Sequence, residues 1–204
     1  GTVVRRLNTL FESPNLDVSL APLSDVHCAG SSCLSPDGGV RLSEFPGGTK
    51  IARAYADAYD PSQETARFPG LFTDRSNNLL VSSGFAEINL YQEDGTAVHQ
   101  VSSAVTTRFE AKRASWNTLP DLEPNSGRIE LPMYSFDQAS GEWVAEGDGE
   151  LQLADGQVVS EDDLSAIHDG SYDQQVFVSF ATKHFSTFNC DAPISERACV
   201  KGRI

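Results

Sequence analysis

The sequence is poor in positive charge and has no long apolar run. Its 204 residues include 15 lysines and arginines against 29 aspartates and glutamates, a net charge of −14. Nucleic acids and anionic membrane surfaces both need a basic face on the protein that binds them, so this acidity argues against either partner. No stretch of 18 or more apolar residues occurs, as a membrane-spanning helix would require. We therefore expect no nucleic-acid partner and no membrane insertion.

The common motifs of nucleotide, metalloprotease and hydrolase sites are also missing. The sequence contains no Walker loop, GxGxxG, GxSxG, HExxH or complete EF-hand loop. Nothing in it requires a cofactor. Calcium is an open alternative, because acidic runs offer the oxygen ligands that this ion prefers. A solvated acidic surface is the other interpretation of these runs. The runs are Asp57-Ala-Tyr-Asp60, Glu146-Gly-Asp148, Asp155 and Glu161-Asp-Asp163.

Cysteine is scarce, and the four cysteines fall into two local pairs, Cys28 with Cys33 and Cys190 with Cys199. Four cysteines allow three pairings; we predict the two local disulfides, with free thiols as the alternative. No CxxC motif occurs and no histidine has ligand spacing beside these residues, which disfavours zinc. Disulfides are typical of oxidising compartments, so we expect an extracellular, cell-surface or periplasmic protein.

Short stretches with the alternation of a β-strand fill most of the chain. Residues 85–91, for example, place Ala86, Ile88 and Leu90 on one face and polar side chains on the other. Many such stretches at short spacing are typical of a β-sandwich. Strands are also predicted over residues 16–20, 40–45, 103–109, 128–136, 142–145, 150–154 and 175–188, with residues 51–59 as a strand or a short helix.

The sequence predicts one short helix, which begins after Ser160 with acidic first-turn residues and ends near Gly170. We therefore expect an all-β protein, a β-sandwich with additional N-terminal strands and loops and at most one short helix. Residues 1–15 form a lead-in segment. Residues 16–80 form a β and loop region that packs on the sandwich, which spans residues 81–204 with its C-terminal tail.

A His-Phe-Ser triplet, His184-Phe185-Ser186, ends the longest strand pattern. In a regular strand the side chains of the first and third residues point to one face about 7 Å apart. For the histidine to act as general base, an imidazole nitrogen has to lie about 2.6–3.2 Å from the serine hydroxyl oxygen. A bend at Phe185 would bring imidazole and hydroxyl together and strain the Phe185–Ser186 peptide. Ser186 would then attack the Phe185 carbonyl carbon, with His184 as base. An ordinary strand end with an inert histidine is the alternative.

Residues 85–191 resemble the ZU5-type β-sandwich module and related domains of bacterial surface proteins and of cartilage intermediate layer-like extracellular proteins. The resemblance rests on the stretch from Ile129 to Gly147, which includes Trp143, and on His184-Phe-Ser-Thr-Phe-Asn189. Some ZU5-type domains cleave themselves between Phe and Ser of this triplet. Here the resemblance implies cleavage of the Phe185–Ser186 bond, with Ser186 as nucleophile and His184 as base. Cys190, shortly after the triplet, has no place in the family pattern.

The leading hypothesis is therefore a self-processing module of a larger secreted or surface protein. The reaction is an N→O acyl shift followed by ester hydrolysis; it turns over once and has no external substrate. Its partners are neighbouring domains of the same polypeptide and its own C-terminal fragment. The alternative is a non-catalytic adhesion or spacer module stabilised by calcium. Trp143 is expected in the core in either case.

Overall fold

The computed structural model describes residues 27–29, 32–35, 38–46, 51–71, 73–76, 78–120 and 129–194. No helix in these ranges is long and apolar enough to cross a membrane. The strands are β1 (His27–Ala29), β2 (Ser32–Leu34), β3 (Val40–Ser43), β4 (Arg53–Tyr59), β5 (Leu79–Tyr91), β6 (Gln100–Ala111), β7 (Glu130–Asp137), β8 (Glu142–Leu153), β9 (Val176–His184) and β10 (Thr187–Ile194). The helical segments are η1 (Thr65–Arg67), η2 (Arg113–Thr118) and α2 (Glu161–His168).

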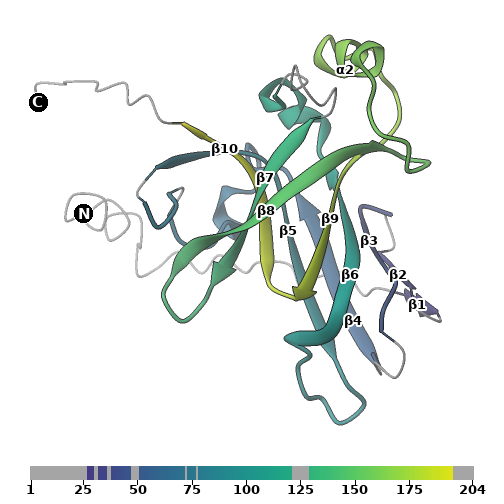
Figure 1. Cartoon of the computed structure of the whole chain (residues 1–204), viewed down its shortest axis with the longest axis vertical. Helices are drawn as coiled ribbons and strands as arrows, with labels where there is room; N and C mark the ends of the chain where they lie inside the picture. The colour runs from purple at the N-terminus through teal and green to yellow at the C-terminus, as the bar shows by residue number, and fades with distance from the viewer. Residues whose placement is uncertain are drawn as a thin grey trace, which may run out of the picture.

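The ten strands form one antiparallel sheet in the order β1-β2-β3-β6-β9-β8-β7-β10-β5-β4. The sheet curls so that β4 and β5 contact β6, and β4 also contacts β1 and β3 near the opposite edge (Figure 1). The main core lies inside the curled sheet. It includes Ile88 of β5, Phe109 of β6 and Val178 of β9, all fully buried. The expected all-β class with one short α-helix is confirmed, and β1–β4 belong to the same sheet as β5–β10.

The strand pattern around Ile88 is confirmed, whereas the single strand predicted over residues 175–188 is wrong, because the chain bends at Ser186 and these residues belong to two strands, β9 and β10. Ala86, Ile88 and Leu90 are buried in the core, while Glu87 and Asn89 point to the other face and remain partly exposed. Residues 51–59, for which strand and helix were both open, contain strand β4, which pairs along its whole length with β5. The predicted strand over 16–20 and the lead-in segment over 1–15 lie outside the described residues.

Helix α2 is confirmed. The Ser160 hydroxyl accepts a hydrogen bond from the Asp163 backbone N–H at 3.2 Å, and Asp163 Oδ2 accepts one from the Ser160 N–H at 3.1 Å. This reciprocal pair satisfies backbone donors that have no partner within a first helical turn. Leu164 and Ile167 bury the inner face of the helix.

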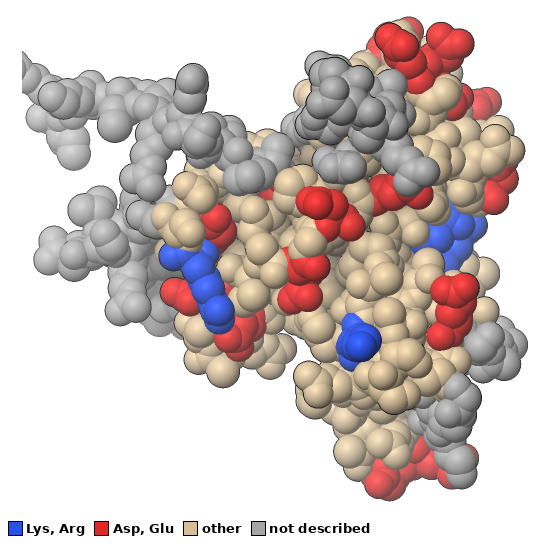
Figure 2. Space-filling model, in the orientation of Figure 1, with Lys and Arg blue, Asp and Glu red and all other residues tan. Residues whose placement is uncertain are grey.

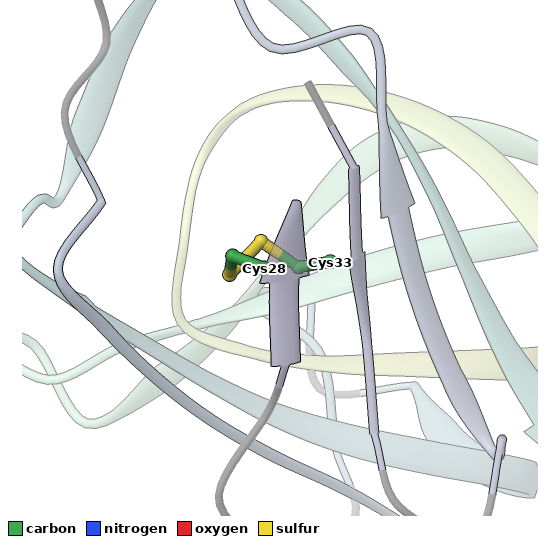
Figure 3. Close-up of a disulfide and its surroundings, with 2 residues drawn as sticks. All are labelled: Cys28 and Cys33. Atoms are coloured by element: carbon green, nitrogen blue, oxygen red, sulfur yellow. A yellow bond between two sulfur atoms is a disulfide. The ribbon is translucent and has the colours of Figure 1, made fainter. Parts of the chain in front are cut away.

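The two predicted disulfides have different outcomes. Cys28 and Cys33 lie directly opposite each other on β1 and β2 and are bonded, as predicted (Figure 3). The Cys190–Cys199 pairing is wrong, because Cys190 is a buried free thiol. Its strand β10 lies between β5 and β7, and its Sγ donates a hydrogen bond to the Gly84 carbonyl at 3.3 Å. Cys199 lies outside the described residues.

Candidate functional site

The candidate site lies where β9 leads into β10. Strand β9 pairs with β6 and β8, whereas β10 pairs with β5 and β7, and only Phe185 and Ser186 join the two strands. Figure 1 shows β9 and β10 meeting at this point like the arms of a V. The chain bends at Ser186, one residue after Phe185, where the self-cleavage hypothesis requires a bend. The connecting peptide is trans, and Glu44 is the one described non-glycine residue with a positive φ, so strained dihedrals of that kind do not occur at the bend.

Neighbouring strands hold both sides of the Phe185–Ser186 bond. The Phe185 N–H donates to the His99 carbonyl at 3.0 Å, and the Ser186 carbonyl accepts from the Ile88 N–H at 3.1 Å. The Phe185 ring is 5% exposed and lies 6.0 Å from the ring of Phe45. These contacts fix the bond in position while the chain changes direction.

A surface cleft of about 470 Å³ lies beside this bond. His184, Phe185 and Ser186 all line the cleft, so the structure brings the three predicted site residues together. The other walls are residues 135–139, Thr187, Glu87, Asn89, His99 and Gln100.

The two side chains predicted to act together each hold another partner. The Ser186 hydroxyl donates to the Phe136 carbonyl oxygen at 2.8 Å. His184 Nε2 lies 3.1 Å from Glu146 Oε2. The bend therefore places the His184 imidazole and the Ser186 hydroxyl in one cleft. The hydroxyl is hydrogen-bonded to β7, and the imidazole contacts Glu146 of β8.

Glu146 is a site residue that the sequence analysis missed. It was assigned to an acidic run with calcium or solvent as its partner, but its carboxylate bridges two side chains. Glu146 Oε1 accepts from the Ser135 hydroxyl at 2.6 Å, and Glu146 Oε2 faces His184. The His184 backbone is held as well, because Thr182 Oγ1 donates to its carbonyl at 3.0 Å and accepts from its N–H at 3.2 Å. No local sequence signal links Glu146 to a histidine so far along the chain.

The other acidic runs have protein partners. Asp60 Oδ1 accepts from the Ser62 N–H at 2.8 Å, Asp155 Oδ1 accepts from the Gln157 N–H at 2.9 Å, and Asp163 caps α2. Within the described ranges, no group of three or more His, Cys, Asp or Glu residues could hold a metal ion. Figure 2 shows acidic side chains spread over the visible face and few basic ones. Calcium binding stays a prediction.

Trp143 is buried, as expected, and it supports the wall of the cleft. Its ring is 1% exposed and lies 5.4 Å from the Phe136 ring and 4.8 Å from the Phe68 ring. The Phe136 carbonyl is the group that accepts the Ser186 hydroxyl. The aromatic cluster of Phe68, Phe136 and Trp143 therefore underlies the β7 side of the site.

Comparison of the chain with protein-family models, with curated proteins and with solved structures finds no match. The chemistry of the cleft therefore has to be interpreted from its own residues.

Proposed function

We propose that this protein cleaves its own Phe185–Ser186 bond. The observation that carries the proposal is the two-residue connection between β9 and β10, which is anchored on both sides and lines a cleft together with His184. A nucleophile, a base and a backbone carbonyl held in one rigid unit need no binding step. Such preorganisation lowers the barrier by several kcal/mol relative to free reactants.

The reaction begins when the Ser186 hydroxyl oxygen attacks the carbonyl carbon of Phe185 and its proton passes to His184. The C–N bond breaks, His184 returns the proton to the departing Ser186 nitrogen, and an ester joins the Phe185 acyl group to Ser186 Oγ. Water then hydrolyses the ester. The products are a carboxylate on Phe185 and a free amine and hydroxyl on Ser186, so every atom is accounted for without a cofactor.

One hydrogen bond has to break before attack. Ser186 Oγ has to leave the Phe136 carbonyl and turn towards the carbonyl carbon of Phe185. A hydrogen bond of this type contributes about 0.5–1.5 kcal/mol net, so this rearrangement is small beside a chemical barrier.

The developing negative charge on the Phe185 oxygen also needs N–H donors. Three side-chain amides line the cleft: that of Gln138, which follows β7, and those of Asn89 on β5 and Gln100 on β6. The proposal concerns the last two. Asn89 Nδ2 donates to Glu87 Oε1 at 3.0 Å, which fixes the orientation of its amide. We assign the role of oxyanion donor to these two amides as part of the proposal.

Cleavage would divide the chain into residues 1–185 and 186–204. The observed disulfide lies wholly within the first piece, and β10, the start of the second, lies between β5 and β7. The pieces would remain together through these two ladders and the buried side chains of β10. The C-terminal fragment is then a partner of its own protein, displayed on a secreted or surface polypeptide.

The decisive experiment is intact mass of the purified protein after denaturation and reduction. Wild type should yield the two pieces with new ends at Phe185 and Ser186, and Ser186→Ala should stay whole. Ser171→Ala, at an exposed loop position outside the cleft, is the matched control and should cleave like wild type. A wild-type protein that keeps its full mass after days at neutral pH contradicts the proposal.

The second candidate, a non-catalytic adhesion or spacer module, is supported by one observation. His184 and Ser186 both have stable partners in the structure, as structural side chains do. If calcium stabilises such a module, added Ca²⁺ should raise Tm and a chelator should reverse the shift. A protein that remains whole and responds to calcium in this way is the outcome this candidate predicts.

A further inference from the structure

We propose that Glu146 is a positioning residue that keeps the proton of neutral His184 on Nε2, so that Nδ1 is the nitrogen that acts as base. The effect on cleavage rests on the proposed function. The effect on the imidazole tautomer does not, because it depends only on the contacts of His184.

A β-bulge places Glu146 in this position. Along the β7–β8 ladder Met133 lies opposite Gly147, and the next residue, Tyr134, lies opposite Ala145. Glu146 is therefore the extra residue of β8, with no residue directly opposite it in the β7–β8 ladder. A bulge redirects the side chain of the inserted residue, and here that carboxylate meets His184 from β9. Gly147, next to it, has φ of 113°, a conformation that favours glycine.

The carboxylate is oriented from both sides. The Ser135 hydroxyl is on a residue only 5% exposed and donates to Oε1, which leaves Oε2 towards His184 Nε2 at 3.1 Å. A carboxylate accepts hydrogen bonds and donates none, so the imidazole nitrogen facing it has to carry the proton. In the neutral ring, the other nitrogen, Nδ1, then has the free lone pair.

Nδ1 is also the nitrogen suited to Ser186. It is bonded to the ring carbon next to Cβ and so lies nearer the main chain, on which Ser186 is two residues away. During attack the Ser186 hydroxyl proton passes to Nδ1 and the ring becomes an imidazolium. Glu146 stays ionised and stabilises that cation through Nε2–H, and Nδ1 later returns the proton to the Ser186 amine.

Glu146→Gln is the sharpest variant. The glutamine carbonyl would take the bond from Ser135, which turns the amide N–H₂ towards His184 Nε2. An N–H donor there requires a lone pair on Nε2 and moves the ring proton to Nδ1. The base is then lost without loss of side-chain volume. Asp148→Asn removes the same charge two residues further along β8, at an exposed position, and is the matched control.

The first measurement is the tautomer of His184, from ¹⁵N chemical shifts of the ring in Ser186→Ala protein, which cannot cleave. We expect the Nε2–H form in that background and with Asp148→Asn added, and the Nδ1–H form with Glu146→Gln added. An unchanged tautomer in the Glu146→Gln protein overturns the inference, whether or not the wild type cleaves.

The second measurement is the rate of cleavage, followed by intact mass after refolding. Glu146→Gln should slow it by about 100-fold or more, in line with the loss of a positioned base. Gly147→Ala keeps every reacting group but strains the bulge, so it should slow cleavage too while leaving the Glu146 charge in place. Glu146→Gln cleaving at the wild-type rate overturns the inference and leaves self-cleavage intact. A wild type that never cleaves overturns the proposed function alone.

Discussion

Asn189 donates a hydrogen bond from its side-chain amide to Asp191 Oδ2 in the interior of the protein, and Asp191 Oδ1 has no partner within the described part of the chain. Both residues are fully buried on β10. The Ser82 hydroxyl of β5 donates to Asn189 Oδ1 at 2.6 Å and extends the network across the ladder. Burial raises the pKa of Asp191 to about 8, so this carboxyl group is largely protonated at neutral pH.

The raised pKa of Asp191 predicts that the free energy of unfolding falls as pH rises between 3.8 and about 8. The folded protein keeps the proton up to about pH 8, whereas the unfolded chain releases it near 3.8. The contribution of Asp191 to the free energy of unfolding is therefore fully present below the unfolded pKa and is lost as pH rises to about 8. Between these limits the loss is about 1.4 kcal/mol per pH unit.

Asp191→Asn tests this contribution, since it leaves an uncharged group at every pH. Urea unfolding at several pH values should show that the variant gains on wild type as pH rises from 5 to 8. The control is Asp169→Asn, an exposed carboxylate beyond the end of α2. If the free energies of unfolding of wild type and Asp191→Asn change with pH in parallel, Asp191 is not a buried protonated carboxyl group.

The thiol of Cys190 should be unreactive in the folded protein. It is fully buried, and burial raises its pKa well above the ordinary value, so little thiolate is present to attack a reagent. In a Cys199→Ser background, a thiol reagent should label nothing in the native state and one site in urea. Rapid labelling without urea would mean that β10 leaves the sheet readily.

Trp143 should tolerate phenylalanine far better than alanine. Its indole N–H has no hydrogen-bond partner among the described residues, so phenylalanine loses ring volume but no bond seen there. Alanine instead opens a cavity beside Phe68 and Phe136, with an expected cost of about 3–5 kcal/mol. Urea unfolding of both variants checks that the phenylalanine variant is the more stable one. Because Phe136 accepts the Ser186 hydroxyl, the alanine variant should also change the rate of self-cleavage.

Removal of the Cys28–Cys33 disulfide should cost less stability than removal of a disulfide that closes a longer loop. The bond closes a loop with a sequence separation of 5 at the edge of the sheet. For so short a loop the chain-entropy model gives about 2 kcal/mol. Cys28→Ser with Cys33→Ser should therefore unfold at slightly lower urea and still cleave, since the cleft lies on other strands. A complete failure to fold would show that β1 and β2 support the core more than their edge position indicates.

Local pattern was enough to predict much of the fold. The alternation around Ile88 and the capping residues at Ser160 both mark elements that the structure confirms. Residues 142–145 and 150–154 were predicted as separate strands, and Gly147 and Gly149 lie between them. In the structure the glycines allow one long strand, β8, to bulge and bend.

The candidate site was only partly predictable. His184, Phe185 and Ser186 are neighbours in sequence, so a bend is enough to bring them into one cleft. The contacts of Glu146 depend on a bulge and on the pairing of distant strands. Gly147 is the one local mark of the bulge, and the strand pairing leaves no mark on the sequence near Glu146. The pairing of Cys190 with Cys199 was predicted from their closeness in sequence. That prediction failed because Cys190 lies on the central strand β10, and its place there depends on strand pairing that the local sequence does not show.

The place of β10 between β5 and β7 has a mechanical consequence. A bond cut at the start of a central strand removes the covalent path but leaves two rows of backbone hydrogen bonds that carry tension. Pulling on the downstream polypeptide would load both rows at once, and they would yield together. A self-cleaved protein of this architecture would hold its two fragments together at rest. It would release the C-terminal fragment only above a threshold force.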